Sequence, residues 1–285
     1  MLWLDPMPLV SDLAIAYQEY YTHSNRETSN LRTFAKGVYR FLVEVLLFFV
    51  TVPGERARAK RMFIDREVPG RLLDVGCGRG DFLHTMAKRG WDVHGVDFDR
   101  AAAMAAKALY GLDVRVGTLN DVVSSGDRFD VVTASHVLEH VPDPSEFLSQ
   151  CRLLLKSGGM LILKTPNVGS FGHKLYANCW RGLEPPRHLH LFTINALNMC
   201  AAGAGFASVR SFTTATGAEQ ILIASHYIKR RGGFRPETFG LLTAIVSRLL
   251  APLLAIRAQI EWLINRETGE EICTILIADA PSAKV

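Results

Sequence analysis

Apolar and polar positions change period repeatedly along the middle of the chain. Short apolar runs predict strands, and segments with apolar residues three or four positions apart predict helices. The predicted strands are 71–76, 91–96, 112–116, 129–134, 159–164, 207–214 and 272–278. The predicted helices between them are 81–89, 99–109, 144–156 and 195–204. This alternation predicts an α/β domain whose mostly parallel sheet has helices on both faces.

Two helical regions are expected outside this alternation. Residues 1–65 are predicted to form an N-terminal helical segment, and 66–285 the main domain with a helical insertion at about 218–268. The longest apolar stretch of the insertion, 239–264, follows a basic cluster and is interrupted by Arg248, Pro252 and Arg257. A membrane span needs about 20 apolar residues, so we expect no span. Packing as a cap, packing in a homodimer and contact with an anionic membrane surface all remain open.

The first predicted strand ends in a turn that carries three glycines. Gly76, Gly78 and Gly80 alternate with other residues, and Asp81 begins a segment with helical spacing. Glycine allows positive φ and lets a ligand approach the backbone. A helix N-terminus after such a turn offers N–H groups to an anionic ligand group. Strand, glycine turn and helix together predict a nucleotide-type ligand at this point.

The residues around the turn indicate which nucleotide. Dinucleotide enzymes use G-x-G-x-x-G, whereas this turn has G-x-G-x-G, with Asp81 where the third glycine would fall. A carboxylate there would repel a pyrophosphate, while Asp74 and Asp81 suit a nucleoside with a cationic amino-acid tail. Asp97, which ends the second predicted strand, can accept hydrogen bonds from both ribose hydroxyls, and Phe98 can cover a purine face. Asp81 could instead cap the helix, and Asp99 suits the cap of the next one.

At this point the sequence resembles the class I S-adenosylmethionine-dependent methyltransferases. The matching segments are LLDVGCGRG, HGVDFD, FDVVTASHVLEHVPDP and LLKSGGMLILKTPN, between about Arg71 and Asn167. The bacterial branch similar to ubiquinone-pathway O-methyltransferases also has a Trp-containing loop and a segment like PRHLHLFT, found here at 186–193. The resemblance implies a Rossmann-like seven-stranded sheet with the last strand antiparallel, and S-adenosylmethionine as cofactor.

The resemblance also implies which residues hold the cofactor. The expected set is Asp74, Gly76, Cys77, Gly78, Gly80, Asp97, Phe98, Thr118, Leu119 and Ser135. One position departs from the family, which has Gly-Asp after the third strand where this chain has Gly117-Thr118. Thr118 can still accept a hydrogen bond from the adenine.

Histidines are the candidates for proton transfer, because their ordinary pKa is near 6.5. His188 is the first candidate for general base and His140 the second. The acceptor side is expected to include Tyr17, Tyr21, His136, Trp180, Arg187 and His190. His188 and His190 could instead only fix their loop by hydrogen bonds, and Trp180 could belong to the core. His-x-x-Glu-His at 136–140 also resembles an inverted zincin pattern, but Pro142 and Pro144 rule out the helix it needs. No metal site is expected, although Glu139 and His140 leave a divalent ion open.

Composition limits the class of partner. The net charge of +4 on 285 residues is too small to indicate nucleic-acid binding, and no Asn-Pro-Pro-Tyr-type motif for a flipped base is present. The five cysteines lie far apart, which fits a reducing compartment. The N-terminus lacks the pattern of a secretory signal. We therefore expect a cytoplasmic protein, with the inner face of the membrane as an open alternative.

These features together predict an S-adenosylmethionine-dependent methyltransferase. The expected acceptor is a small molecule, glycan or lipid-like compound, methylated on oxygen by in-line transfer with a histidine base. An NAD-dependent Rossmann oxidoreductase and a non-catalytic cofactor-binding scaffold are the alternatives.

Overall fold

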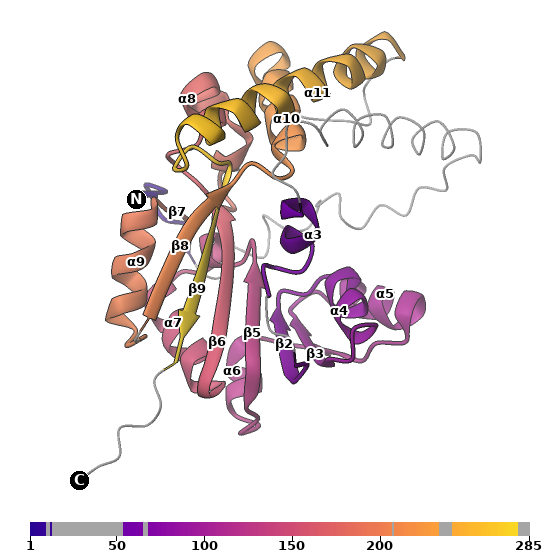
Figure 1. The fold of residues 1–285 in the computed structure, drawn as a ribbon, viewed down its shortest axis with the longest axis vertical. Coiled ribbons are helices and arrows are strands. Elements are labelled where there is room, and N and C mark those ends of the chain that lie inside the picture. The colour runs from indigo at the N-terminus through magenta and orange to yellow at the C-terminus, as the bar shows by residue number, and fades with distance from the viewer. Residues whose placement is uncertain (10–11, 13–53, 65–67, 207, 234–240, 279–285) are drawn as a thin grey trace.

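The computed structural model describes residues 1–9, 12, 54–64, 68–206, 208–233 and 241–278. Its centre is a seven-stranded sheet with strand order β4-β3-β2-β5-β6-β9-β8 (Figure 1). The strands are β2 (Arg71–Val75), β3 (Asp92–Asp97), β4 (Val114–Val116), β5 (Phe129–Ser135), β6 (Leu155–Pro166), β8 (Ser208–Thr214) and β9 (Glu271–Ile277). All seven predicted strands are confirmed.

Strand direction also follows the expectation. β2 runs parallel to β3 and to β5, and β9 pairs antiparallel with both β6 and β8. β6 is longer than predicted, because Leu155 already pairs with Phe129 before a register shift. The chain order of neighbours reverses at β2, where β3 lies on one side and β5 on the other. Ligands of open α/β sheets bind at the carboxyl ends of strands at such a point.

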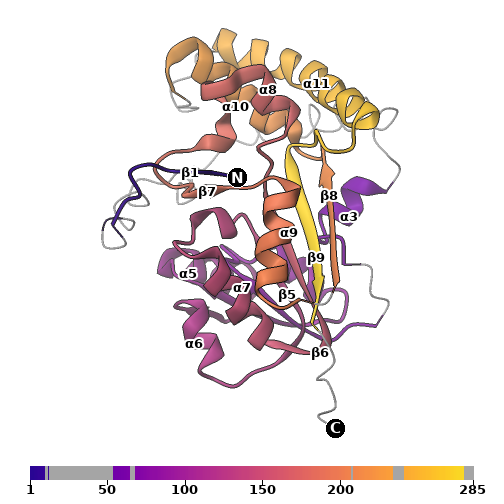
Figure 2. The same cartoon turned by 90° about the vertical axis from the view of Figure 1, so that its left-hand side faces the viewer.

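Helices cover both faces of the sheet, as the alternating pattern predicts. They are α3 (Glu55–Ala59), α4 (Asp81–Ala87), α5 (Arg100–Tyr110), α6 (Leu119–Val123), α7 (Pro144–Leu153) and α9 (Ile194–Gly203). One core joins the sheet to α6, α7 and α9 through Val122, Leu148 and Leu197. The second core, on the other face, includes Leu83 and Met86 of α4. Figure 2 shows α7 and α9 on one side of the sheet and α3 on the other.

The starts of the helices show which polar residues act as caps. The Asp99 carboxylate accepts the Ala101 N–H at 2.8 Å, so Asp99 caps α5 as expected. Gly80, with φ 82°, is the N-cap of α4, and Asp81 is the first helical residue. Asp81 therefore does not cap α4. Its carboxylate accepts hydrogen bonds from the Arg79 guanidinium at 2.6 Å and from the Tyr110 hydroxyl.

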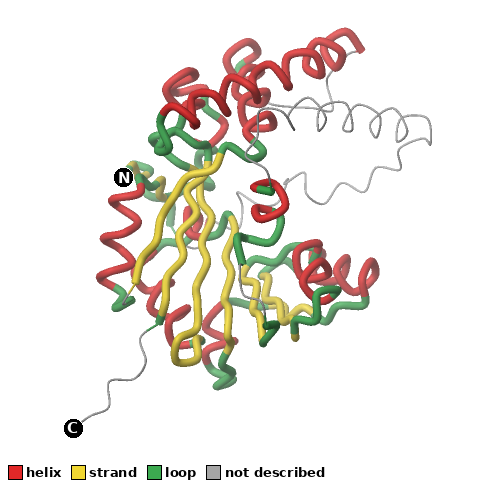
Figure 3. Tube along the Cα trace, viewed as in Figure 1, coloured by secondary structure: helices red, strands yellow, loops and turns green. Residues whose placement is uncertain are grey.

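A helical layer lies at the carboxyl ends of the parallel strands (Figures 1 and 3). It consists of α8 (Phe171–Tyr176), α10 (Ala218–Arg231) and α11 (Leu241–Ile264). α10 and α11 are inserted between β8 and β9, where the helical insertion was predicted. Apolar contacts among Phe171, Trp180, Leu222 and Ala258 join the three helices. Within the described ranges, no helix is both long and apolar enough to cross a membrane.

The N-terminus adds a contact that the sequence did not predict. β1 (Leu2–Trp3) pairs antiparallel with β7 (His190–Leu191), placing Trp3 beside His190. Short 3-10 helices, η3 (Leu138–His140), η4 (Ala177–Cys179) and η5 (Arg181–Leu183), precede β7 in the chain. Leu2–Trp3 therefore form a strand at the start of the predicted N-terminal helical segment. The helices expected within 13–53 lie outside the described residues.

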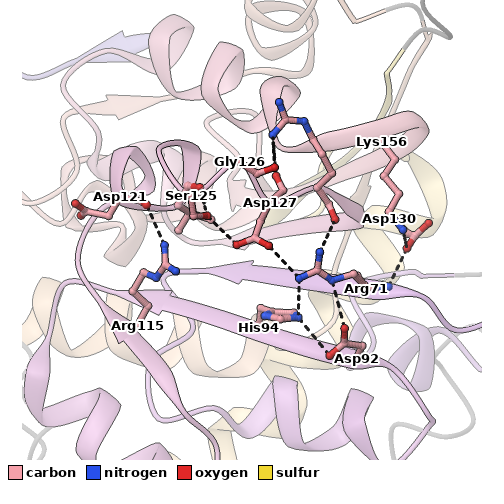
Figure 4. A network of polar contacts seen from close by, with 12 residues as sticks. Arg71, Asp92, His94, Arg115, Asp121, Ser125, Gly126, Asp127, Asp130 and Lys156 are labelled. Atoms are coloured by element: carbon pink, nitrogen blue, oxygen red, sulfur yellow. Dashed lines mark hydrogen bonds and ion pairs between the residues drawn. The ribbon is translucent and has the colours of Figure 1, made fainter.

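A polar network lies at the amino ends of the parallel strands, at the end of the sheet opposite the helical layer (Figure 4). The Arg71 guanidinium contacts the carboxylates of Asp92 at 3.3 Å and Asp127 at 3.2 Å. The backbone N–H of Arg71 donates to Asp130, which also pairs with Lys156 at 2.8 Å. These contacts tie the first residues of β2, β3 and β5 together at the end of the sheet that lies away from the helical layer (Figure 1).

Candidate functional site

The turn after β2 has the geometry that its glycines predict. Gly76, Gly78 and Gly80 have φ values of 68°, 54° and 82°. A Cβ on Gly76 would lie 2.6 Å from Val137 Cγ2, so this part of the turn packs against the loop after β5. A Cβ on Gly78 would meet no atom within 4 Å. The turn is thus fixed at Gly76 and open at Gly78, where a ligand can approach the backbone.

Asp97, at the end of β3, fixes the shape of this turn. Its carboxylate accepts the Gly78 N–H at 2.7 Å and the Asp99 N–H at 2.9 Å. The side chain is buried. A carboxylate offers about four lone-pair positions, so Asp97 can accept several hydrogen bonds at once.

Asp74 lies under the same turn at the end of β2. It is buried, and its carboxylate accepts the Thr133 hydroxyl at 2.6 Å. Burial raises the pKa of Asp74 to about 7 against the opposing Thr133 hydrogen bond, and the nearby Asp97 charge adds to the rise. A cationic ligand group beside Asp74 would lower this pKa again, because a nearby positive charge favours the ionised carboxylate.

The loop after β5 carries a chain of charged contacts. His136, which has a φ of 56°, lies 3.0 Å from Glu139 and 2.7 Å from Glu271 through its two ring nitrogens. Lys164 reaches the same Glu271 oxygen at 3.3 Å. Burial by itself lowers the pKa of His136, but the two carboxylates outweigh it and raise the pKa to about 9. His136 is therefore a cation that holds two buried carboxylates in place.

Glu139 is the fully buried centre of this chain of contacts. Its second oxygen accepts the Thr165 hydroxyl at 3.0 Å. Burial raises the pKa of Glu139, yet its hydrogen bond to His136 and the neighbouring imidazoles more than reverse this and lower it to about 2. Glu139 is therefore a carboxylate at neutral pH.

His140 and His188 lie ring against ring beside Glu139. Their ring centroids are 4.7 Å apart with a near-perpendicular orientation. Nδ1 of His140 lies 3.0 Å from the Arg187 carbonyl, and Nδ1 of His188 lies 2.7 Å from the Gly182 carbonyl. Burial lowers the pKa of His188, so its imidazole is neutral at pH 7. One ligand atom from each of Glu139, His140 and His188 can be chosen so that all three lie within 4.8 Å of one another.

Backbone contacts hold the two histidine segments together. The Leu189 N–H donates to the Glu139 carbonyl at 2.8 Å, and the His188 N–H donates to the Glu184 carbonyl. Glu184 is ion-paired with Arg181 and Arg187. The segment 184–190 is thus fixed against η3, which brings both predicted base candidates to the carboxyl edge of the sheet.

Comparisons with known proteins decide the family. A family model described as a methyltransferase domain matches residues 53–211, which is more than half of the chain. The chain belongs to this methyltransferase family.

Curated relatives of the methyltransferase agree over a shorter range. A ubiquinone biosynthesis O-methyltransferase from Cereibacter sphaeroides is 42% identical over 102 residues. A protein of the same name from Hahella chejuensis is 40% identical over 115 residues. The matches cover 34% and 37% of this chain, and 41% and 48% of those relatives. The chain therefore matches less than half the length of either relative.

Solved structures agree in fold. A SAM-dependent methyltransferase from Archaeoglobus fulgidus has a TM-score of 0.52 at 22% identity, covering 84% of this chain and 99% of its own. Phosphoethanolamine N-methyltransferase 2 of Haemonchus contortus, in complex with S-adenosyl-L-methionine, has a TM-score of 0.53 at 17% identity. That alignment covers 95% of this chain and 60% of the other. At these identities the likeness supports the Rossmann-like fold.

The turn of the methyltransferase fits S-adenosylmethionine. The space over Gly78 gives access to the backbone, Asp97 can accept from the ribose, and Asp74 can face the cationic tail. One part of the argument from the sequence is corrected, because Arg79 neutralises the Asp81 carboxylate that was expected to repel a pyrophosphate. The fit therefore depends on Asp74 and Asp97.

The other predicted cofactor residues line the same edge. Phe98 follows Asp97 directly and is 64% exposed. Thr118, at the start of α6, donates its hydroxyl to Asp121 at 2.9 Å, and its N–H donates to the same oxygen. Asp121 was not among the predicted residues. It places a carboxylate next to Thr118, the position at which the family has an aspartate. Cys77 lies in the turn after β2, Leu119 is the first residue of α6, and Ser135 is the last residue of β5.

Two predictions for the acceptor side are corrected. Trp180 is 1% exposed and donates its indole N–H to Glu270 at 3.1 Å, so it belongs to the core. Both ring nitrogens of His136 already contact carboxylates, so neither remains for a substrate. His190 is buried, and its Nε2 lies 3.2 Å from the Pro142 carbonyl.

The structure describes only one of the three remaining acceptor-side candidates. Arg187 is half-buried and ion-paired with Glu184. Tyr17 and Tyr21 lie outside the described residues.

Sequence reasoning missed the two acids at the start of β9. Glu271 faces His136 and Lys164, while Glu270 accepts the Gly172 N–H at 2.6 Å and the Trp180 indole. Two consecutive glutamates directly before an apolar strand were the available signal, because an acid entering a buried strand needs a partner.

Proposed function

We propose that this methyltransferase transfers the methyl group of S-adenosylmethionine to a hydroxyl oxygen of a small-molecule, glycan or lipid-like acceptor. In this proposal His188 takes the hydroxyl proton and His140 is the alternative base. The observation that carries the proposal is the contact of His188 with His140, because His140 belongs to the loop whose Val137 packs against the glycine turn at Gly76. The name of the curated relatives supports oxygen as the atom methylated.

S-adenosylmethionine, when bound, supplies an electrophilic methyl group on a sulfonium. Asp97 would orient the ribose and Asp74 the cationic tail, so that the methyl group faces the acceptor. Alignment of this kind contributes about 7–11 kcal/mol. His188 suits a base because its Nδ1 is held by the Gly182 carbonyl, so that Nε2, which lies 3.8 Å from Oε2 of Glu184, would receive the proton. A positioned base contributes about 10²–10⁴-fold.

A lipid-like acceptor is supported by the outer face of α11. Leu253, Ile260 and Ile264 are 62%, 46% and 79% exposed along one stripe of this helix. The exposed basic residues Lys229, Arg230 and Arg231 end the neighbouring α10. Apolar side chains beside basic ones suit the surface of an anionic bilayer. We propose that the protein meets its acceptor at the cytoplasmic face of a membrane.

The proposal is tested by transfer of a labelled methyl group from S-adenosylmethionine to phenolic, glycan and lipid extracts. His188→Gln should lower turnover by about 10²–10⁴-fold, with cofactor affinity unchanged in calorimetry. His226→Gln, on α10 and away from the cluster, is the matched control and should retain turnover. Cofactor binding without transfer to any extract would favour the non-catalytic scaffold, and heat released with NAD would favour the oxidoreductase.

A further inference from the structure

The cluster of Glu139, His140 and His188 has the composition of a metal site. It offers one carboxylate and two imidazoles, with one ligand atom of each within 4.8 Å of the others. We infer that these three side chains bind a divalent transition-metal ion of the zinc class. The sequence left a divalent ion at Glu139 and His140 open, and the structure adds His188 as a third ligand.

The imidazoles are oriented as metal ligands usually are. A ligating histidine donates one ring N–H to a backbone carbonyl or carboxylate, which fixes the tautomer and leaves the other nitrogen to the metal. Nδ1 of His140 faces the Arg187 carbonyl at 3.0 Å, and Nδ1 of His188 faces the Gly182 carbonyl at 2.7 Å. Because Nδ1 of each ring faces a carbonyl, Nε2 of each ring is the nitrogen that a metal ion would take. Nε2 of His188 also lies 3.8 Å from Oε2 of Glu184.

The carboxylate is supported in the same way. Glu139 is fully buried, with His136 on one oxygen and the Thr165 hydroxyl on the other. Each carboxylate oxygen has two lone-pair positions, so both can still coordinate. Second contacts of this kind orient a ligating carboxylate.

The donor set selects among metals. Two histidines and one glutamate form the ligand set of catalytic zinc sites, which keep one position open for water or substrate. Magnesium and calcium prefer sites made of oxygen atoms, so two imidazoles disfavour them. Zinc binds nitrogen and oxygen at about 2.0–2.2 Å, so small side-chain rotations would bring the three atoms onto one ion.

A metal here would deepen the proposed function, and this role depends on that function. A hydroxyl on the open position ionises more easily, because the charge of the ion lowers its pKa. The acceptor O–H bond would break with its proton passing to solvent water, and the oxyanion would attack the methyl group as its bond to sulfur breaks. In the metal-loaded protein the imidazoles are therefore ligands, and the ion replaces the histidine base.

Metal binding is measured directly on the full, untagged chain. Protein stripped with a chelator is titrated with zinc chloride in a calorimeter, and with cobalt(II) while its visible absorption is recorded. We expect one equivalent of zinc and a cobalt spectrum of a low-coordinate nitrogen and oxygen site. Loss of a supporting contact alone typically costs 10–100-fold in metal affinity, so loss of a ligand in His140→Gln should cost at least about 100-fold.

Controls separate this site from other metal-binding groups. His226→Gln should bind zinc as wild type does. His140 is half-buried, so its variant should fold, and circular dichroism checks this; His188→Gln is the second variant. Binding below a tenth of an equivalent, unchanged affinity in both folded variants, or a cobalt–thiolate absorption band would each overturn the inference. Methyl transfer without zinc binding would overturn only the metal, whereas zinc binding without methyl transfer would overturn only the proposed function.

Discussion

At the scale of single residues, a substitution in the turn after β2 can distinguish the effect of backbone strain from the effect of ligand contact. Gly78 has positive φ and open space where a Cβ would lie, while Gly76 has positive φ and a side chain 2.6 Å away. An alanine at position 78 therefore meets only backbone strain, about 1–2 kcal/mol, unless a ligand occupies that space. Gly126, in the turn after α6, has φ 76° and the same open surroundings.

Gly78→Ala should weaken S-adenosylmethionine binding at least about tenfold, or about 1.4 kcal/mol, because its methyl group would enter the space over the turn. Gly126→Ala carries the same strain at a remote turn and should bind as wild type does. Calorimetry gives the affinities, and thermal unfolding should show similar losses of stability in the two variants. Wild-type affinity in Gly78→Ala would remove this turn from the site.

Asp97→Asn should weaken cofactor binding by about 1.5–3 kcal/mol, because a charge-assisted hydrogen bond to the ribose is lost. Asp113→Asn is the matched control, since Asp113 is an exposed partner of Lys107 near the start of β4. Affinities from calorimetry that are equal for Asp97→Asn and Asp113→Asn would contradict the role of Asp97.

At the scale of elements, one buried carboxylate joins α8 to β9. Glu270 is fully buried and accepts from Gly172 in α8 and from the Trp180 indole. Burial raises the pKa of Glu270 to about 7 from an ordinary 4.5, despite these hydrogen bonds. A group whose pKa is higher in the folded state stabilises the fold at low pH, and this contribution is lost as pH rises from about 4.5 to about 7.

Glu270→Gln should therefore flatten the decline in the free energy of unfolding between pH 5 and pH 8. One pKa unit corresponds to about 1.4 kcal/mol. The free energy of unfolding should therefore fall by about 3 kcal/mol more in wild type than in the variant over this range. Urea unfolding at each pH measures it. Glu267→Gln, on the exposed loop before β9, is the control and should keep the wild-type slope. Parallel curves for wild type and Glu270→Gln would show that Glu270 is ionised throughout.

At the scale of the whole molecule, the helical layer and the site lie at the same end of the sheet (Figure 1). α10 and α11 are inserted between β8 and β9, and α11 keeps an exposed apolar stripe. A bilayer contact through this stripe would deliver an acceptor to the end of the sheet where the histidines lie.

The protein should float with vesicles containing anionic phosphatidylglycerol and less with zwitterionic vesicles. Ile260→Asp combined with Ile264→Asp should reduce flotation, because charged side chains resist burial in the interface. Met199→Asp is the control, since Met199 is 75% exposed on α9, away from the helical layer. Flotation that is absent, or equal for the double variant and wild type, would contradict the membrane contact and leave homodimer or cap packing as the role of α11.

The local sequence determined the succession of strands and helices along the chain and the residues expected to bind the cofactor. Period-2 and period-3.6 patterns, a glycine turn and the acid that ends β3 are encoded within a few consecutive residues, so they can be recognised without a fold. The tertiary structure alone decided which distant residues meet: Glu271 with His136, Glu270 with Trp180, and His188 with His140 and Glu139. The physical reason is that burial and hydrogen bonding of a side chain depend on neighbours far away in the sequence. Trp180 illustrates it, because an indole fits a substrate face or a core equally well until its surroundings are known.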